Sequence, residues 1–119
     1  MFTTLLNALA FLAVVAVLST ASAHAQDDCA AKCRACAESC KKCAADCQTS
    51  NPVCAKICAG CANLCLACAT LDGTRLEATV RAACEKVCRE CAAVCQKGAD
   101  ASCQECARVC LACADSCKG

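Results

Sequence analysis

The spacing of the cysteines constrains this chain more than any other feature of its sequence. In the stretch CRACAESCKKCAADC, Cys33 to Cys47, the steps between cysteines alternate between three and four residues. This alternation averages about 3.5 residues, the repeat of the inward seam of a helix in a coiled coil or bundle. The period of two in a β-strand would put the same residues on both faces of a sheet. Each run of cysteines therefore predicts one face of one α-helix.

Four such runs follow one another along the 119 residues and together hold all 20 cysteines. The runs are Cys29, Cys33, Cys36, Cys40, Cys43 and Cys47; Cys54, Cys58, Cys61, Cys65 and Cys68; Cys84, Cys88, Cys91 and Cys95; and Cys103, Cys106, Cys110, Cys113 and Cys117. Helical spacing predicts that all of these side chains point into the centre of one bundle. They are the candidate functional residues of the chain.

The breaks between the first three runs carry residues that end and begin helices. Ser50 or Asn51 is suited to the N-cap position of a helix, and Pro52 to its first turn, where the missing N–H does no harm. Gly73 is suited to the end of the second helix, because glycine readily adopts the left-handed conformation found there. These signals predict that the helices are joined by short loops.

Similar signals mark the remainder of the break after the second run and the break that follows the third run. Thr74 and Glu77 have the spacing of a capping box, and Gly98 followed by Asp100 repeats the pattern of a helix stop and an N-cap. Short loops between helices favour antiparallel neighbours, so we expect an all-α, up-down-up-down four-helix bundle. The expected helices span residues 28–48, 52–70, 75–97 and 100–117.

The residues beside the cysteines are mostly alanine, which lets neighbouring helices approach closely. When the cysteines are assigned to the a and d positions of a heptad, the e positions, which directly follow the d cysteines, are alanine in every case but one, Glu85. Ordinary apolar side chains flank the cysteines mainly in the second and third helices, which could also form an oligomer surface. Before Cys84 the third helix offers only Leu76 and Val80 inward. We therefore expect one end of the bundle to be an apolar plug without thiols.

The N-terminus is predicted to be a secretory signal peptide, residues 1–25. An apolar run from Leu5 to Leu18 is followed by small residues that allow cleavage after Ala23 or Ala25. An uncleaved membrane anchor is the alternative, although the run falls short of the roughly 20 residues of a span. The mature domain would be residues 26–119, exported to the bacterial periplasm or outside the cell, with no stable membrane span after cleavage.

Composition excludes several functions for the mature domain. Twelve Lys and Arg residues balance 11 Asp and Glu residues, without blocks of one sign, so no nucleic-acid partner is expected. The only Met and both Phe residues lie in the expected signal peptide, and the only histidine, His24, survives only if cleavage follows Ala23. A general base for catalysis is therefore missing, and we do not expect an enzyme.

Simple packing and disulfides are two explanations for so many inward cysteines. A few free cysteines pack well as small apolar residues, but 20 of them in place of leucine would make a weak core. An exported protein could instead use disulfides. Disulfide-rich domains usually have irregular spacing, whereas the residues between these cysteines are good helix formers. A metal-independent, disulfide-stabilised helical protein remains the alternative to a metal-binding one.

Metal binding is the remaining explanation, and charge favours a monovalent ion. The chain contains seven C-x-x-C pairs, such as Cys33 and Cys36, which are a zinc signal when taken singly. If every four thiolates held one Zn²⁺, a large negative charge would stay in the core. The C-x-x-C-x-x-C run of ferredoxins is absent. Cu(I) prefers thiolates and would give a neutral core at about one ion per thiolate, or on the order of 20 ions. Zinc or another soft metal is retained as an alternative.

The runs CAAKCRACAESCKKCAADC and CAKICAGCANLCLACA, on predicted helices, resemble the bacterial cysteine-rich four-helix-bundle copper storage proteins. The resemblance covers the whole mature chain. It implies that the 20 cysteines bind multiple Cu(I) ions per chain, for storage or sequestration, and that the protein forms a homo-oligomer, a tetramer in related members. Relatives commonly have Met or His near the open end of the bundle, and this mature chain has no Met and at most His24. Its copper donor and recipient proteins are not specified by the resemblance.

Overall fold

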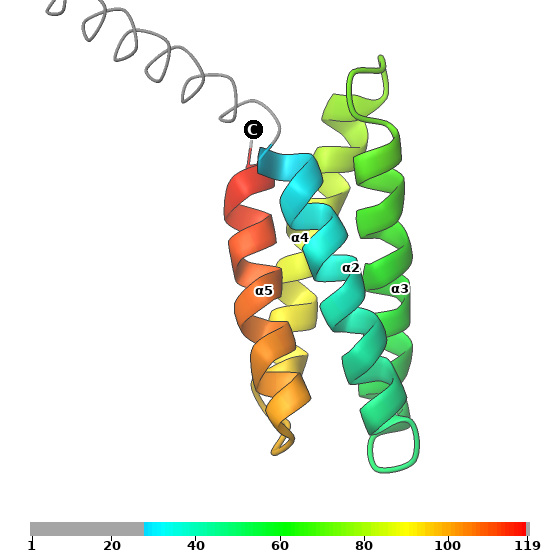
Figure 1. Ribbon diagram of the computed structural model, residues 1–119, viewed down its shortest axis with the longest axis vertical. Helices are drawn as coiled ribbons and strands as arrows, with labels where there is room; N and C mark the ends of the chain where they lie inside the picture. Colours follow the sequence, from blue (N-terminus) through cyan, green and yellow to red (C-terminus); the bar gives the residue numbers. More distant parts are fainter. Residues whose placement is uncertain (1–27, 119) are drawn as a thin grey trace, which may run out of the picture.

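Four α-helices make up residues 28–118, the part of the chain that the computed structural model describes (Figure 1). They are α2 (Asp28–Cys47), α3 (Pro52–Thr70), α4 (Glu77–Cys95) and α5 (Ala101–Cys117). Their bounds agree with the four predicted helices to within about two residues. The predicted signal peptide, residues 1–25, and both of its cleavage sites lie outside the described residues.

The helices form a closed ring in which each one packs against two others. Both α2 and α4 contact α3 and α5, and consecutive helices run in opposite directions (Figure 1). This arrangement confirms the predicted up-down-up-down four-helix bundle. One end of the bundle, which we call the terminal end, holds the start of α2, the end of α5 and the loop 71–76. The other end, the two-loop end, holds the loops 48–51 and 96–100.

Two of the predicted helix boundaries are formed by the expected residues. Asn51 is the N-cap of α3, where its side-chain oxygen accepts a hydrogen bond of 3.1 Å from the backbone N–H of Cys54. Pro52 occupies the first turn. Gly73 has a φ of 79°, which only glycine adopts without strain, and so reverses the chain after α3. These predictions are confirmed.

The capping box predicted for Thr74 and Glu77 is wrong. The Thr74 hydroxyl donates a hydrogen bond to the carbonyl of Leu71 and accepts one from the N–H of Leu76, so it belongs to the turn that follows α3. The N-cap position of α4 is Leu76, which makes no side-chain cap. Asp100 does occupy the N-cap position of α5, but its side chain also makes no capping bond.

The core of the bundle consists almost entirely of cysteine and alanine. All 20 cysteines are buried, and the remaining buried residues are six alanines and Val80. The predicted apolar plug is only partly correct, because Leu76 is 47% exposed and the buried residues of the same end include Cys29, Cys68 and Cys117 as well as Val80. The small side chains let the helices approach closely, as the alanines beside each run of cysteines predict.

Helix α3 is the one helix among the described residues that is long and apolar enough to cross a membrane. Cysteine and alanine supply much of this apolar character. The core helices of globular proteins pass the same test of length and composition. All five cysteines of α3 are buried against the other helices of the bundle, so its inward face already has a partner.

Candidate metal centre

The cysteine side chains fill the centre of the bundle from one end to the other. Eighteen of them are free thiols. The other two, Cys29 at the start of α2 and Cys117 at the end of α5, are joined by a disulfide across 88 residues of sequence. This bond closes the terminal end of the bundle and connects the two ends of the described chain.

Within a helix, the thiols that touch are four residues apart. Six such pairs have their sulfurs 3.8–4.0 Å apart, for example Cys36 with Cys40 and Cys84 with Cys88. Among the described thiol–thiol hydrogen bonds, none joins the two cysteines of a C-x-x-C pair. An α-helix has 3.6 residues per turn, so cysteines three and four residues apart lie on the same face of the helix. Within one helix of the described core, only the sulfurs four residues apart touch. The zinc-like C-x-x-C motif is therefore not the contact unit of this core.

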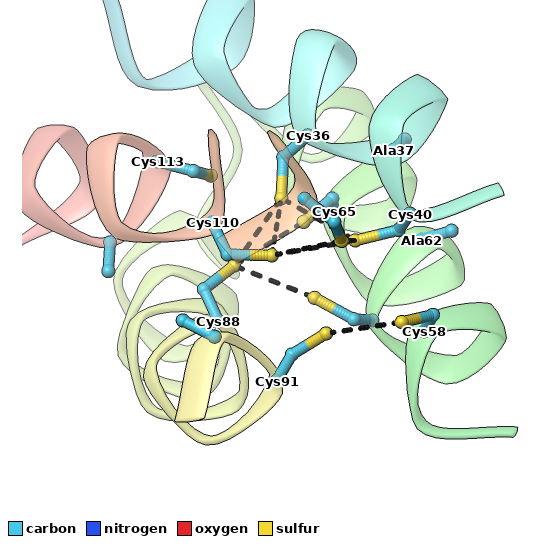
Figure 2. Packing of buried hydrophobic residues seen from close by; sticks show 14 of the residues in the cluster. Cys36, Ala37, Cys40, Cys58, Ala62, Cys65, Cys88, Cys91, Cys110 and Cys113 are labelled. Carbon is cyan, nitrogen blue, oxygen red and sulfur yellow. Dashed lines mark hydrogen bonds between the residues drawn. The ribbon is translucent and has the colours of Figure 1, made fainter. Parts of the chain in front are cut away.

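Between helices, the sulfurs approach each other at similar distances. Figure 2 shows the middle of the core, where Cys36 lies 3.5 Å from Cys110 and 4.0 Å from Cys88. The Cys58 and Cys91 sulfurs are 3.8 Å apart across α3 and α4. Together these thiols come from all four runs of the sequence, so the bundle brings the runs into one connected network of sulfur.

Several groups of four sulfurs have all four atoms within 4.8 Å of one another, which is close enough to hold a metal ion. Two of the groups contain Cys117, whose sulfur is bonded to Cys29, so they can hold an ion only after this disulfide is reduced. Each of the five groups named here contains one pair four residues apart in a single helix and one cysteine from each of two other helices. The groups are Cys29, Cys33, Cys68 and Cys117; Cys33, Cys84, Cys113 and Cys117; Cys36, Cys40, Cys61 and Cys110; Cys36, Cys61, Cys65 and Cys88; and Cys40, Cys91, Cys106 and Cys110.

Neighbouring groups share sulfurs. Cys36 and Cys61 both belong to two groups in the middle of the core, and Cys40 and Cys110 link one of these to a third group. A thiolate shared between two groups can bridge two metal ions. The arrangement is therefore suited to a continuous metal–thiolate cluster more than to isolated mononuclear sites.

The described core offers no positive side chain to balance ionised thiols. No polar or charged residue is buried in it. Burial raises the pKa of the Cys43, Cys54 and Cys68 thiols, because the thiolate loses its hydration. The pKa of Cys47 is raised to about 11 by its hydrogen bond with Cys103 first and by burial second. Several thiolates at once would therefore require metal ions as counter-charges.

The fold and this core define a class of protein, the helical bundles whose interior is a network of closely spaced thiols that can bind metal. The family model described as Csp, copper storage protein, matches residues 22–119. The chain therefore belongs to the copper storage protein family, as its resemblance to that family predicted. Neither a curated protein nor a solved structure matches it at a significant level. The copper storage family is not a family of enzymes.

The structure brings all 20 predicted site residues into the core, while their role as metal ligands remains a prediction. Sequence reasoning missed three features. It missed that each sulfur group draws on three helices, that Cys29 pairs with Cys117, and that the Asp100 carboxylate approaches a thiol. A signal was present only for Asp100, which stands beside the last run of cysteines but was interpreted as a helix cap. The other two features depend on how the helices pack.

Proposed function

We propose that the protein stores Cu(I) as a cluster bound by the thiolates of its core, in an exported compartment. The observation that carries the proposal is the set of overlapping four-sulfur groups, in which neighbours share Cys36, Cys61, Cys40 or Cys110. Membership of the copper storage family supports copper as the cargo. Cu(I) is the copper ion that binds thiolates in sites of low coordination number.

The charge of the core supports a monovalent ion. Each thiol that binds copper loses its proton to solvent, so one Cu(I) per thiolate leaves the interior neutral. Zn²⁺ bound by four thiolates would leave two negative charges per site, in a core whose described residues include no buried cation. Burial raises the pKa of the Cys54 and Cys68 thiols, so these two thiols would lose their protons when they bind copper rather than beforehand.

The test is a titration of metal-free protein under anaerobic conditions with Cu(I) held by a competing chelator. With the Cys29–Cys117 disulfide intact, 18 free thiols set the upper limit at about 18 ions. Full reduction raises the number of thiols to 20 and the limit accordingly. Saturation at about five ions or fewer would contradict the proposal and favour a zinc-type site or a disulfide-stabilised structural protein. The free-thiol count is measured on the same sample.

Export is proposed from the signal peptide predicted at residues 1–25. Intact-mass measurement of the protein recovered from the periplasm or the medium should give a chain that begins at Gln26 or at His24. A full-length chain in the membrane fraction would favour the uncleaved anchor instead. The homo-oligomer implied by the family resemblance is tested on the same sample by native mass spectrometry, before and after copper loading.

A further inference from the structure

We propose that copper reaches the core at the two-loop end. It enters through a cavity that has Cys47 and Cys103 at its base and Asp100 at its rim. This inference rests on the proposed function, and it names the receiving residues. The core sulfurs are sealed from solvent, since most of the cysteines are 0% exposed. An ion therefore has to be received at a particular place before it can join the cluster.

A cavity of about 280 Å³ opens at the two-loop end between the loops 48–51 and 96–100. It is lined by both loops and by Cys47 and Cys103, whose sulfurs lie 2.8 Å apart. These are two free thiols on different helices, α2 and α5, at the base of one opening. Soft two-sulfur coordination is sufficient to receive Cu(I).

Gly98 keeps this opening clear above the Cys103 sulfur. A Cβ at position 98 would lie 2.9 Å from the Cys103 Cβ and 3.1 Å from its sulfur. The loop is held in this position from outside by Gln104, whose side-chain amide donates hydrogen bonds to the carbonyls of Gly98 and Gln96. The close approach of the backbone therefore needs glycine here, and any side chain would crowd the thiol.

Asp100 is placed to attract a cation to these sulfurs. It stands at the N-cap position of α5 without capping the helix, and its Oδ2 lies 3.8 Å from the Cys47 sulfur, which donates to it. Lys97 lines the same cavity, so the attraction is local to the carboxylate rather than a property of the whole opening. A carboxylate beside a thiol can take a cation from solvent and pass it to the softer ligand.

From this opening, a continuous series of sulfurs leads to the middle of the core. The steps are 3.2 Å from Cys103 to Cys43, 3.9 Å from Cys43 to Cys95, 3.4 Å from Cys95 to Cys58 and 3.8 Å from Cys58 to Cys91. Cys91 belongs to the group with Cys40, Cys106 and Cys110. An ion can therefore move inward by exchanging one sulfur ligand for the next without leaving the thiol network.

The described residues at the terminal end form a cavity of a different kind. A cavity there, lined by Glu77, Arg81 and Glu85 among others, reaches a single cysteine, Cys117. The sulfur of Cys117 is bonded to Cys29 and so is not a free ligand. The Arg81 guanidinium lies in the same cavity and donates a hydrogen bond to the carbonyl of Ser116. With the disulfide intact, this opening leads to no free thiol.

Rapid-mixing experiments test the proposal by measuring the initial rate and the final amount of Cu(I) transferred from a coloured chelator. The sample is metal-free, full-length mature protein with the disulfide intact. Asp100→Asn should slow the initial phase about threefold to tenfold without changing the final amount. The control is Asp28→Asn, which makes the same change of charge at the terminal end, where Asp28 accepts a hydrogen bond from Ser116. Its rate should match the wild type.

A second pair of variants removes one thiol from each end. Cys103→Ser should slow the initial phase about tenfold more than Cys68→Ser, although both lower the final amount by about one ion. Equal initial rates within both pairs, with the final amounts stated above, would overturn the assignment of the two-loop end but not copper storage. A final amount of about five ions or fewer in the wild type would overturn copper storage itself. Helical circular dichroism verifies that each variant is folded.

Discussion

Both ends of the bundle carry buried cysteines, and the two ends differ in the chemical state of their outermost sulfurs. At the terminal end, Cys29 and Cys117 are joined to each other. At the two-loop end, Cys47 and Cys103 remain thiols at the base of a cavity, with the Asp100 carboxylate beside them. The series of thiols along the core is therefore chemically different at its two ends.

The chemical state of a cysteine in this core therefore depends on its surroundings more than on its motif. Cys47 and Cys117 are each the second cysteine of a C-x-x-x-C pair, after Cys43 and Cys113. Cys47 lies against a carboxylate and another thiol, whereas Cys117 is joined to Cys29 by a disulfide. Four predictions test this contrast, beginning with the one that has the largest expected effect.

The largest effect is expected from removing the link at the terminal end. A disulfide across 88 residues restricts the unfolded chain strongly, so the Cys29→Ser/Cys117→Ser double variant should lose about 4 kcal/mol of unfolding free energy. Urea unfolding near about pH 6, where thiol exchange is slow, measures this loss. Reduction of the wild type should remove the difference. A double variant as stable as the oxidised wild type would show that the bond does not constrain the terminal end.

At the two-loop end, the matching perturbation is Gly98→Ala. The new Cβ would lie 2.9 Å from the Cys103 Cβ, so the first turn of α5 has to shift, at a cost of about 1–3 kcal/mol. Urea unfolding measures the loss of stability. The same substitution should slow copper uptake, because it crowds the Cys103 sulfur. Unchanged stability together with unchanged uptake would mean that this loop does not approach Cys103 as closely as described.

Alkaline pH should weaken both ends alike, because burial raises the pKa of Cys54 at one end and of Cys68 at the other. Above the ordinary thiol pKa of 9.0 the unfolded chain loses protons that the folded protein keeps. Stability is therefore fully present below about pH 9 and falls above it, by about 1.4 kcal/mol per pH unit for each such thiol. Urea unfolding at increasing pH measures the slope.

The matched variants Cys54→Ser and Cys68→Ser should each remove one thiol's share of this slope. The copper-loaded protein should show little slope, since its thiols are already ionised by the metal. If only one of the two variants had a smaller pH slope than the wild type, the thiols at the two ends would not be equally buried. A slope of the same size in the loaded protein would contradict the thiolate cluster.

The smallest effect is expected between the two ends, at Gly60. A Cβ there meets nothing within 4 Å, and the position lies inside α3. Gly60→Ala should therefore stabilise the protein by roughly 1 kcal/mol through helix propensity alone. Gly73→Ala is the contrasting variant, because a φ of 79° makes alanine unfavourable there by about 1–2 kcal/mol. Thermal unfolding of both variants measures the opposite signs, and equal signs would contradict the conformation at Gly73.

Sequence reasoning predicted the helices well where a local signal decided the structure. Asn51, Pro52 and Gly73 act within one turn of their own position, and the structure has them as predicted. The prediction failed for Thr74 and Glu77, because the chain reversal after Gly73 takes Thr74 into its own turn. It was also incomplete for Asp100, whose side chain lies beside Cys47, 53 residues earlier in the chain.

Local spacing was enough to predict that every cysteine lies on the inward face of one of four helices, because helical periodicity is a property of neighbours along the chain. Which sulfurs meet depends instead on how the helices pack. Each of the five named sulfur groups takes cysteines from three helices, the disulfide joins residues 88 positions apart, and Asp100 lies beside Cys47 only because two loops share one end of the bundle. The physical reason is that contacts between helices depend on their order, tilt and relative shift, which no local spacing encodes.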